Sequence, residues 1–331
     1  NDLRKNITAK WWELKNSNNL TAYEMDRALR LIVNGKEEED IFQVFEMLAL
    51  EKKNNPQFSK SLYQKYSNIT AKLKTFRPKA TFADVNHDFL GKWVNNLFTE
   101  HELATNTVSR YVVFFQTLMN EAKRRGYHDN ESYKGFSVKR TKTVYPYLTL
   151  EELDKIYNHQ FDNEHLHNTK ILLLKGCYSG QRFSDWHKVR PSNIVNIGGD
   201  DYYRISTKKT RDVVNILAFD KLRHLVNMEA RTMSLTKFNI HVKTVCKDAG
   251  IKQPFVRQSY KGNIMKDEEF SKHQVVTSHI GRRSFVCNSL LAGVPEESIK
   301  KVGGWKTDAA FRKYIQLSSV DGLQVFKTAF N

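Results

Sequence analysis

The sequence has few cysteines and no long apolar run. Its three cysteines, Cys177, Cys246 and Cys287, lie far apart and form no C-x-x-C pair. This pattern argues against a disulfide framework and against a zinc site, and it fits a reducing cytoplasm. A membrane span would need a run of about 18 apolar residues, and neither such a run nor a signal peptide is visible. We therefore expect no membrane partner.

Acidic residues are outnumbered by basic ones. Lys and Arg number 53 against 36 Asp and Glu, which gives a formal net charge of +17 over 331 residues. Charge of one sign destabilises a compact chain by self-repulsion, so an excess this large is typical of proteins with a polyanionic partner. The alternative is a basic soluble protein without such a partner. A chain of this length is expected to form two domains.

Four segments in the first part of the chain carry apolar residues at helical spacing. The first begins after residues 36–40 and ends at Pro56, the second stops before Pro78, and the fourth ends in Lys123–Arg125 before Gly126. We predict a small all-α domain over residues 36–126, preceded by a segment 1–35 of unclear role. The apolar residues of the four helices are Ile41, Val44, Phe45 and Leu48; Leu62, Tyr63, Tyr66, Ile69 and Leu73; Phe89, Leu90, Trp93, Val94 and Leu97; and Val108, Tyr111, Val112, Phe115, Leu118 and Met119.

Helical periodicity lapses over residues 127–147. Basic residues accumulate there, among them Lys139, Arg140 and Lys142, and we interpret the segment as an interdomain linker. Thr149-Leu-Glu-Glu152 follows. It is a capping box, in which the Thr and Glu side chains pair with free N–H groups at the start of a helix. We expect the second domain to begin here and to cover residues 148–317.

The second domain contains one convincing β segment, from Asp201 to Ala218. Apolar and aromatic residues at 202–205 and at 213–216 flank a polar turn, which predicts a β-hairpin. Lys208 and Lys209 lie at its bend, where a lysine is most often only a solvated turn residue.

A candidate anion site begins at Thr277. Thr277 or Ser278 is predicted to cap a helix, because its hydroxyl can accept from free N–H groups of the first turn. His279 and Arg282 then stand three residues apart on one face, and Arg283 adds a second guanidinium. The N-terminus of a helix favours an anion. A His-x-x-Arg pair alone is common by chance.

A short second helix is expected soon afterwards. Gly303 and Gly304 break the chain, and Asp308–Ile315 can form a helix that carries Phe311 and Tyr314 on one side. An aromatic pair of this kind is more often part of a core than of a reactive site. Further motifs are needed to decide.

Four motifs, separated along the chain, decide between a core and a reactive site. They are Arg182 within GCYSGQRFSDW, His279-Ile-Gly-Arg282, Gly303-Gly-Trp305, and Tyr314, nine residues after Trp305. With the hairpin lysine, the chain resembles the tyrosine recombinase (phage integrase) family, whose order is Arg, Lys, His-x-x-Arg, His or Trp, and Tyr. It looks most like integrases of bacterial phages and of conjugative or mobilisable elements. The resemblance is strong over residues 145–320 and weaker over those before them.

The resemblance implies a fold and an activity. The fold is mainly α with a small β-hairpin or sheet, in which an all-α core-binding domain and an α+β catalytic domain form a clamp around DNA. The activity is that of a site-specific recombinase or integrase, which cleaves and rejoins DNA through a 3′-phosphotyrosyl intermediate to integrate or excise a mobile element. No ATP is needed because the bond energy stays in the phosphotyrosine. No acidic cluster with metal spacing accompanies the motifs, so we expect no metal and no other cofactor.

The resemblance also implies roles for individual residues. Tyr314 would attack the scissile phosphate, and a phenol suits this because its ester bond remains reversible. Arg182 and Arg282 would bind the non-bridging oxygens and stabilise the charge of the transition state. Lys209 would protonate the departing 5′-oxygen as general acid, with Lys208 as the alternative.

Three further residues belong to this expected site. His279 would hydrogen-bond the phosphate or take the tyrosyl proton. Trp305 stands where most relatives carry His. Because an indole N–H can only donate, we expect Trp305 to bond phosphate and to pack the tyrosine helix; an ordinary buried Trp is the alternative. Asp185, three residues after Arg182, is a candidate for orienting it.

The expected partners are double-stranded DNA at attachment or core sites, further copies of the chain in a homo-tetramer, and DNA-bending accessory proteins. A tail at residues 318–331, with Val320, Leu323, Phe326 and Phe330 at helical spacing, would dock on a neighbouring protomer or pack against its own domain.

The expected location is the bacterial cytoplasm, with the nucleoid. The first residue is Asn1, which leaves open an arm-binding domain before it. Expected DNA contacts are Lys123, Arg124, Arg125, Lys139, Arg140, Lys142, Lys208 and Arg283.

Two other functions are compatible with these residues. A type IB topoisomerase would use nearly the same set to relax DNA without exchanging strands, and the helical domain ahead of the motifs argues against it. A non-catalytic DNA-binding regulator would have kept only the fold. Every catalytic position is filled, which argues against lost chemistry.

Overall fold

The computed structural model describes residues 40–58, 60–228, 230–262 and 264–317, together with Lys5, Thr8, Ala9 and Trp12. Most of the predicted segment 1–35 and the whole predicted tail 318–331 lie outside the described residues. No helix in the described part of the chain is long and apolar enough to cross a membrane. The chain divides into two compact units, one of Asn1–Thr141 with Tyr260–Met265 and one of Lys142–Ser259 with Lys266–Asn331.

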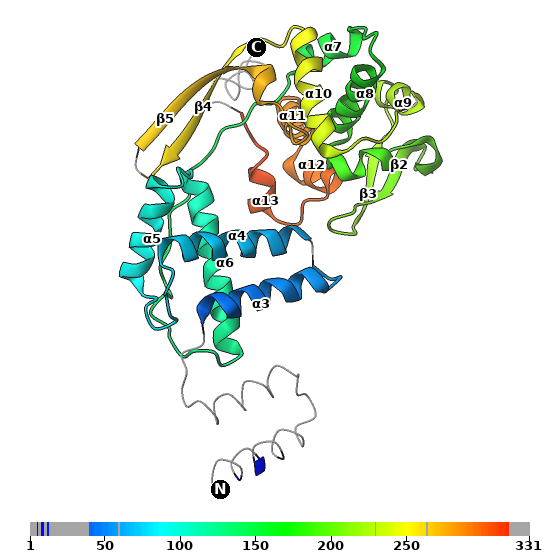
Figure 1. Cartoon of the computed structure of the whole chain (residues 1–331). Coiled ribbons are helices and arrows are strands. Elements are labelled where there is room, and N and C mark those ends of the chain that lie inside the picture. Colours follow the sequence, from blue (N-terminus) through cyan, green and yellow to red (C-terminus); the bar gives the residue numbers. More distant parts are fainter. Residues whose placement is uncertain are drawn as a thin grey trace. The chain divides into compact units, whose positions relative to one another are not determined.

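The described residues of the first unit form the helices α3 (Ile41–Asn54), α4 (Lys60–Phe76), α5 (His87–Thr99) and α6 (Thr105–Arg124), which pack together as a small bundle (Figure 1). The four helices predicted from the apolar spacing are confirmed. Asp40 and Asn86 cap α3 and α5, because their side chains accept from Phe42 N–H and Phe89 N–H.

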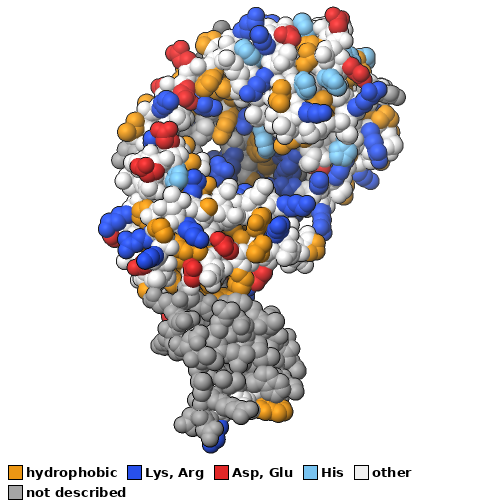
Figure 2. All heavy atoms as spheres, viewed as in Figure 1, with side chains coloured by type: hydrophobic (Ala, Val, Ile, Leu, Met, Phe, Trp, Pro, Cys, Tyr) orange, Lys and Arg blue, Asp and Glu red, His pale blue; other side chains and the backbone are white. Residues whose placement is uncertain are grey.

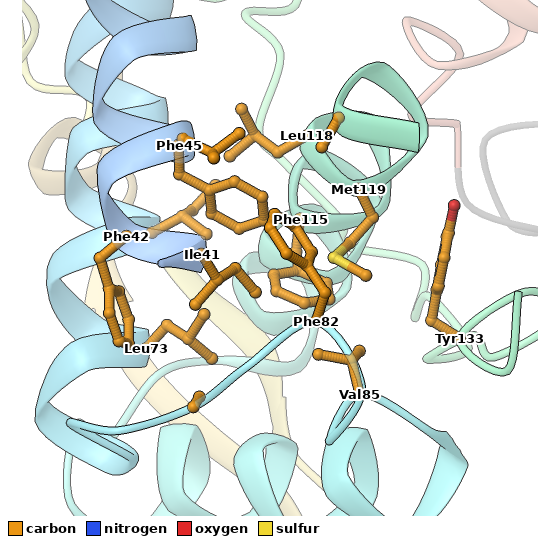
Figure 3. Packing of buried hydrophobic residues seen from close by; sticks show 14 of the residues in the cluster. Ile41, Phe42, Phe45, Leu73, Phe82, Val85, Phe115, Leu118, Met119 and Tyr133 are labelled. Carbon is orange, nitrogen blue, oxygen red and sulfur yellow. The ribbon is translucent and has the colours of Figure 1, made fainter. Parts of the chain in front are cut away.

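The core of this unit is largely aromatic. Figure 3 shows that Phe45 of α3 and Phe115 of α6 point toward each other, and their ring centroids lie 5.7 Å apart at 75°. Residues 127–141, within the predicted linker, form no helix, yet Tyr127 and Tyr133 are buried in the same core. The division between the two compact units therefore falls inside the predicted linker, after Thr141.

The second unit is built around one buried helix, α8 (Glu164–Ser179). Helices α7, α9, α10 and α11 and the 3-10 turn η1 contact it. These contacts bury its apolar run Ile171–Leu174 almost completely. Helices α12 and α13 lie beyond α11 in the chain (Figure 1). The bounds are α7 Leu150–Asn158, η1 Phe183–Lys188, η2 Pro191–Asn193, α9 Asp220–Asn227, α10 Leu235–Asp248, η3 Lys272–Val275, α11 Ile280–Leu291, α12 Glu296–Gly303 and α13 Asp308–Arg312.

In the described part of the chain, two antiparallel sheets complete the fold. β1 (Ile194–Ile197), β2 (Asp200–Ser206) and β3 (Val213–Leu217) lie in that order, and β4 (Pro254–Lys261) pairs with β5 (Ile264–Ser271). The predicted hairpin is confirmed as β2 and β3: Ile205 pairs with Val214, and both are buried. β1 and the β4–β5 hairpin were not predicted. β5 reads IMKDEEFS, which shows no alternation of apolar and polar residues.

Two predicted helix ends are wrong by a few residues. Helix α11 begins at Ile280, with His279 as its N-cap and no side-chain cap, whereas Thr277 or Ser278 was expected. Those two residues instead form a turn, in which Ile280 N–H donates to Thr277 O at 2.8 Å. Helix α13 ends at Arg312, so Tyr314 lies just after the helix rather than within it. The predicted capping box at Thr149 and Glu152 is confirmed.

Candidate active site

The site depends on the close approach of α8 and α11. Gly176 and Gly281 permit it, since a Cβ built on Gly176 would lie 2.2 Å from the Trp186 ring and one on Gly281 only 3.0 Å from the Gly176 backbone. Gly180 caps the C-terminus of α8 with φ +66°, a conformation that favours glycine. Arg182 follows two residues later, and the Gly180 carbonyl ahead of it accepts from the Arg282 side chain of α11 at 2.8 Å.

Arg282 is the central side chain of the site. It is 1% exposed, and its Nη1 donates to Gly180 O at 2.8 Å and to Gly303 O at 2.9 Å. Its Nε and Nη2 are buried without a hydrogen-bond partner among the described residues. Burial lowers the pKa of Arg282 to about 10, so the guanidinium stays charged at neutral pH. A buried cation with two unpaired donors is suited to bind an anion.

Trp305 lies flat against this guanidinium. The Arg282 Cζ is 3.7 Å from the centroid of the Trp305 ring, a cation–π contact. The indole also meets Phe311 and Tyr314 edge to face, with centroids 5.4 and 5.3 Å apart. Its Nε1 is buried and has no partner in the part of the chain that the structure describes. Trp305 thus packs against the tyrosine segment and keeps one N–H to donate.

Tyr314 and His279 meet beside this stack. The Tyr314 hydroxyl lies 3.4 Å from His279 Nδ1. Part of the imidazole faces solvent, yet its pKa is lowered below the ordinary 6.5. The first cause is desolvation of the imidazole by the surrounding protein, and the second is the charge of four cations, Arg283, Arg282, Arg182 and Lys209. His279 is therefore neutral at neutral pH and able to accept a proton.

Arg182 adds a second guanidinium to the cluster. Its charge contributes to lowering the pKa of both His279 and Arg282. Its Nη1 is buried and, within the described ranges, unpaired. Arg182 and Arg282 thus both carry donors that are unpaired among the described residues, and the Arg282 Cζ lies 5.1 Å from the centroid of the Tyr314 ring.

The β2–β3 turn carries the two candidate lysines. Thr207 N–H donates to Asp212 O at 2.9 Å, and Arg211 takes φ +57° to close the turn. Both Lys208 and Lys209 are exposed. The charge of Lys209 lowers the pKa of His279, whereas that of Lys208 lowers the pKa of His187. These charge effects favour Lys209 as the lysine that acts at the cluster, and the assignment stays a prediction.

Asp185 holds this turn in place. It is fully buried, and its Oδ1 accepts from the Lys208 N–H at 2.8 Å and lies 3.2 Å from Lys188 Nζ. Lys188 Nζ also donates to Ser206 O at 2.6 Å. The sequence suggested that Asp185 orients Arg182. In the described part of the chain its side chain instead bonds Ser184, Lys188 and the hairpin backbone.

The residues expected to contact DNA differ in their surroundings. Lys139, Arg140 and Lys142 are exposed. The three basic residues at the end of α6 all pair with carboxylates: Lys123 with Glu131, Arg124 with Glu121, and Arg125 with Glu51 and Glu121. Arg283 is buried, and its guanidinium stacks on the Tyr145 ring at 4.2 Å.

Positive charge gathers around the cluster. Figure 2 shows Lys and Arg side chains concentrated over the part of the second unit where Figure 1 shows α12 and β3. Among the described residues, no group of three or more His, Cys, Asp and Glu is placed to hold a metal ion. The exposed cations on these elements and the adjoining turns include Lys208, Lys209, Arg211, Lys301 and Lys306.

Comparison with known proteins identifies a domain in the first part of the chain. Residues 40–144 match the family model of the phage integrase SAM-like domain. No curated protein matches the sequence.

Solved structures match over most of the chain. A lambda integrase dimer bound to a COC′ core site aligns with a TM-score of 0.62 at 15% identity, covering 83% of this chain and 93% of that one. A lambda integrase tetramer bound to a Holliday junction gives 0.59 at 13%, covering 90% and 87%. XerH site-specific recombinase in a post-cleavage complex with difH gives 0.58 at 13%, covering 99% and 94%. Residues 40–144 thus carry a phage integrase SAM-like domain, and the chain has the fold of the tyrosine recombinases.

Proposed function

We propose that this protein is a site-specific DNA recombinase or integrase that cleaves and rejoins DNA through a 3′-phosphotyrosyl intermediate. The observation that carries the proposal is the Tyr314 hydroxyl, 3.4 Å from a neutral His279 and beside the buried Arg282 guanidinium, whose Nε and Nη2 are unpaired among the described residues. The half-buried Arg182 adds a further unpaired donor, its Nη1. A nucleophile, a proton acceptor and anion donors meet there. Proteins of the same fold are bound to DNA core sites and recombination intermediates.

The proposed reaction is a pair of transesterifications. The Tyr314 oxygen attacks the scissile phosphorus and forms a phosphotyrosyl bond, while the bond from phosphorus to the 5′-oxygen breaks. Lys209 gives a proton to that oxygen, and the tyrosyl proton leaves to His279 or, where His279 bonds the phosphate instead, to solvent. In the second step a free 5′-hydroxyl attacks the phosphotyrosine and restores Tyr314. One ester replaces another in each step, so the chemistry needs no ATP.

The arginines supply the charge stabilisation. Nε and Nη2 of Arg282 and Nη1 of Arg182 are the donors that a phosphate would meet, and the Trp305 Nε1 is a further one. Because these donors are buried and fixed before the reaction, they need no reorganisation when charge develops. This is the role that a metal plays in two-metal nucleases, and we propose that the cation cluster fills it here.

The wider assembly is part of the same proposal. The exposed basic residues at 139–142 would contact the DNA backbone, as would Arg283 and the lysines of the β2–β3 turn. Lys123, Arg124 and Arg125 would do so by exchanging carboxylates for phosphates. A homo-tetramer is supported by the fold shared with lambda integrase, which forms a tetramer on a Holliday junction. The tail 318–331 would link its subunits, and DNA-bending proteins would assist.

A covalent-trapping experiment tests the proposal. The protein is incubated with a nicked suicide DNA that carries a candidate attachment site, separated on a denaturing gel, and the DNA-linked peptide is mapped. We expect the link at Tyr314, and we expect Tyr314→Phe to abolish it while DNA affinity stays within a factor of about three, because few phosphate contacts are lost. Adducts at the wild-type level in Tyr314→Phe would refute the assignment. Relaxation of supercoils without recombinants would instead indicate a topoisomerase.

A further inference from the structure

The side of α11 away from the catalytic cluster holds the chain that leads into the second unit. Ser284 Oγ accepts from the Leu148 N–H at 2.8 Å, and Asn288 Nδ2 donates to the Leu148 carbonyl at 2.9 Å. Both side chains are buried. The segment at residues 145–148 is therefore fixed on the same helix that carries Arg282.

The same segment also contacts the residues after the nucleophile. The Tyr145 N–H donates to Gln316 Oε1 at 2.9 Å, and Gln316 Nε2 donates to the Lys313 carbonyl at 2.9 Å. The Gln316 N–H donates to Cys287 Sγ at 3.4 Å. One amide side chain thus joins the segment of Tyr145 to the turn that contains Tyr314.

A cation–π contact supports Tyr145 from α11. The Arg283 guanidinium lies 4.2 Å from the centroid of the Tyr145 ring. Arg283 is 8% exposed, and its position on α11 next to Arg282 is fixed by the helix. Tyr145, whose N–H bonds Gln316, is consequently held in place by helix α11.

The backbone around Tyr314 is held by a contact from α11, in which Cys287 Sγ donates to the Tyr314 carbonyl at 3.7 Å, and by the bonds of its own turn. Helix α13 ends at Arg312, and the turn beyond it is held by Tyr314 N–H to Phe311 O at 2.8 Å and Ile315 N–H to Arg312 O at 3.3 Å. A phenol on a short turn moves whenever the turn moves. A displacement of about 1 Å in a reacting group can cost a factor of about 100 in rate.

We propose that Gln316 is a positioning residue, which sets the Tyr314 hydroxyl for attack by tying its turn to Tyr145. The proposal rests on the function proposed above. It assigns to Gln316 no contact with the phosphate, so its removal should slow the chemical step and leave DNA binding almost unchanged. Because Tyr145 lies near the end of the predicted linker at residues 127–147, a change in the linker's path would also reach the nucleophile through this bond.

The test compares Gln316→Met, which is similar in size but offers neither an acceptor nor a donor, with Gln316→Glu, which keeps an oxygen for the Tyr145 N–H. The rate of covalent adduct formation on the suicide DNA is measured at saturating DNA, alongside the Kd and the Tm. We expect Gln316→Met to form adduct about 10-fold more slowly with Kd and Tm close to wild type. Gln316→Glu should recover most of that rate. Tyr145→Phe, which retains the ring and the N–H, is the matched control and should resemble wild type.

Several results would overturn the proposal. They are an unchanged rate in Gln316→Met, a loss of DNA affinity or Tm that matches the loss of rate, and a Gln316→Glu rate as low as that of Gln316→Met. The proposed function is judged separately, by whether wild type forms the Tyr314 adduct at all. A wild-type adduct together with a fully active Gln316→Met would remove only the positioning role.

Discussion

The Arg282 guanidinium is stacked on the Trp305 ring, with 3.7 Å between the Cζ atom and the ring centroid. This contact covers one face of the cation, and Nη1 is committed to two backbone carbonyls, those of Gly180 and Gly303. Nε and Nη2 are the donors that remain for a ligand. Arg282 therefore holds the loops around it together and also supplies positive charge to the proposed site. Arg182 lies on a loop and mainly supplies charge.

We predict that Arg182→Ala and Arg282→Ala both slow cleavage far more than they weaken DNA binding. The loss of one fixed donor to a developing anion typically costs a factor of roughly 10²–10³ in rate. Single-turnover cleavage of suicide DNA and a binding titration measure the two effects. Equal losses in both assays would mean that these arginines only hold the DNA backbone.

Thermal unfolding should separate the two arginines. Arg282→Ala leaves the carbonyls of Gly180 and Gly303 without their donor and opens space beneath Trp305. We therefore expect it to lose about 2 kcal/mol or more of unfolding free energy, while Arg182→Ala should change it little. A variant Arg282→Ala as stable as wild type would contradict this account of its buried bonds.

The two hairpin lysines can be distinguished by the leaving group. The charge of Lys209 is among those that lower the His279 pKa, so we predict that Lys209→Ala blocks cleavage of ordinary DNA. A substrate with a 5′-phosphorothiolate at the scissile position should restore it, because a thiolate leaves without a proton. Lys208→Ala is the matched control from the same turn. If it alone shows the rescue, Lys208 is the general acid.

The pH profile reports the role of His279. Its pKa lies below 6.5, so it is neutral at pH 7 and takes up a proton only as the pH falls through that lower value. If His279 accepts the tyrosyl proton, the cleavage rate at subsaturating DNA should decline as the pH falls through that lowered pKa, because the cation can no longer accept. His279→Gln should lack this decline. Wild-type and His279→Gln rates with the same pH dependence would favour hydrogen bonding to the phosphate instead.

The sequence predicts those helices and strands that a local residue pattern indicates. Helices α3 to α6 follow from apolar residues at helical spacing, and the capping box fixes the start of α7. The β4–β5 hairpin has no such pattern because its strands are rich in charged residues. The start of α11 was misplaced since hydroxyl capping was assumed, whereas the Ser278 N–H is taken by Asn239 Oδ1 at 2.9 Å.

The identities of the proposed site residues came from separated motifs, and their roles remain predictions. Their geometry was beyond the sequence, because it depends on pairs that are distant along the chain. Asp185 bonds the backbone of Lys208, and Arg282 bonds carbonyls at Gly180 and Gly303. The bond between Tyr145 and Gln316 joins residues at opposite ends of the second unit's sequence. Neither periodicity nor composition carries a signal for such contacts.

A last prediction concerns Lys175, a buried residue of α8 that takes no part in the proposed chemistry. It is 5% exposed, and burial lowers its pKa from 10.5 to about 8. Below pH 8 the folded and unfolded chains both hold the proton, so the cost of the buried charge is fully present. Between pH 8 and 10.5 the unfolded chain binds more protons at this site, and its contribution to the unfolding free energy rises with pH.

Lys175→Met removes the charge and keeps a similar volume. At pH 7 we expect it to raise the unfolding free energy by on the order of 2 kcal/mol, an advantage that shrinks as the pH approaches 10.5. Denaturant unfolding of wild type and Lys175→Met across this pH range measures the difference in their unfolding free energies, from which the contributions of the other titrating groups cancel.

Lys170→Met is the matched control on the same helix. Lys170 is also buried, but its Nζ donates to the His159 carbonyl at 2.8 Å, so its removal should bring no such gain in unfolding free energy. A Lys175→Met protein that is less stable than wild type at pH 7 would show that the ammonium group is satisfied in the fold.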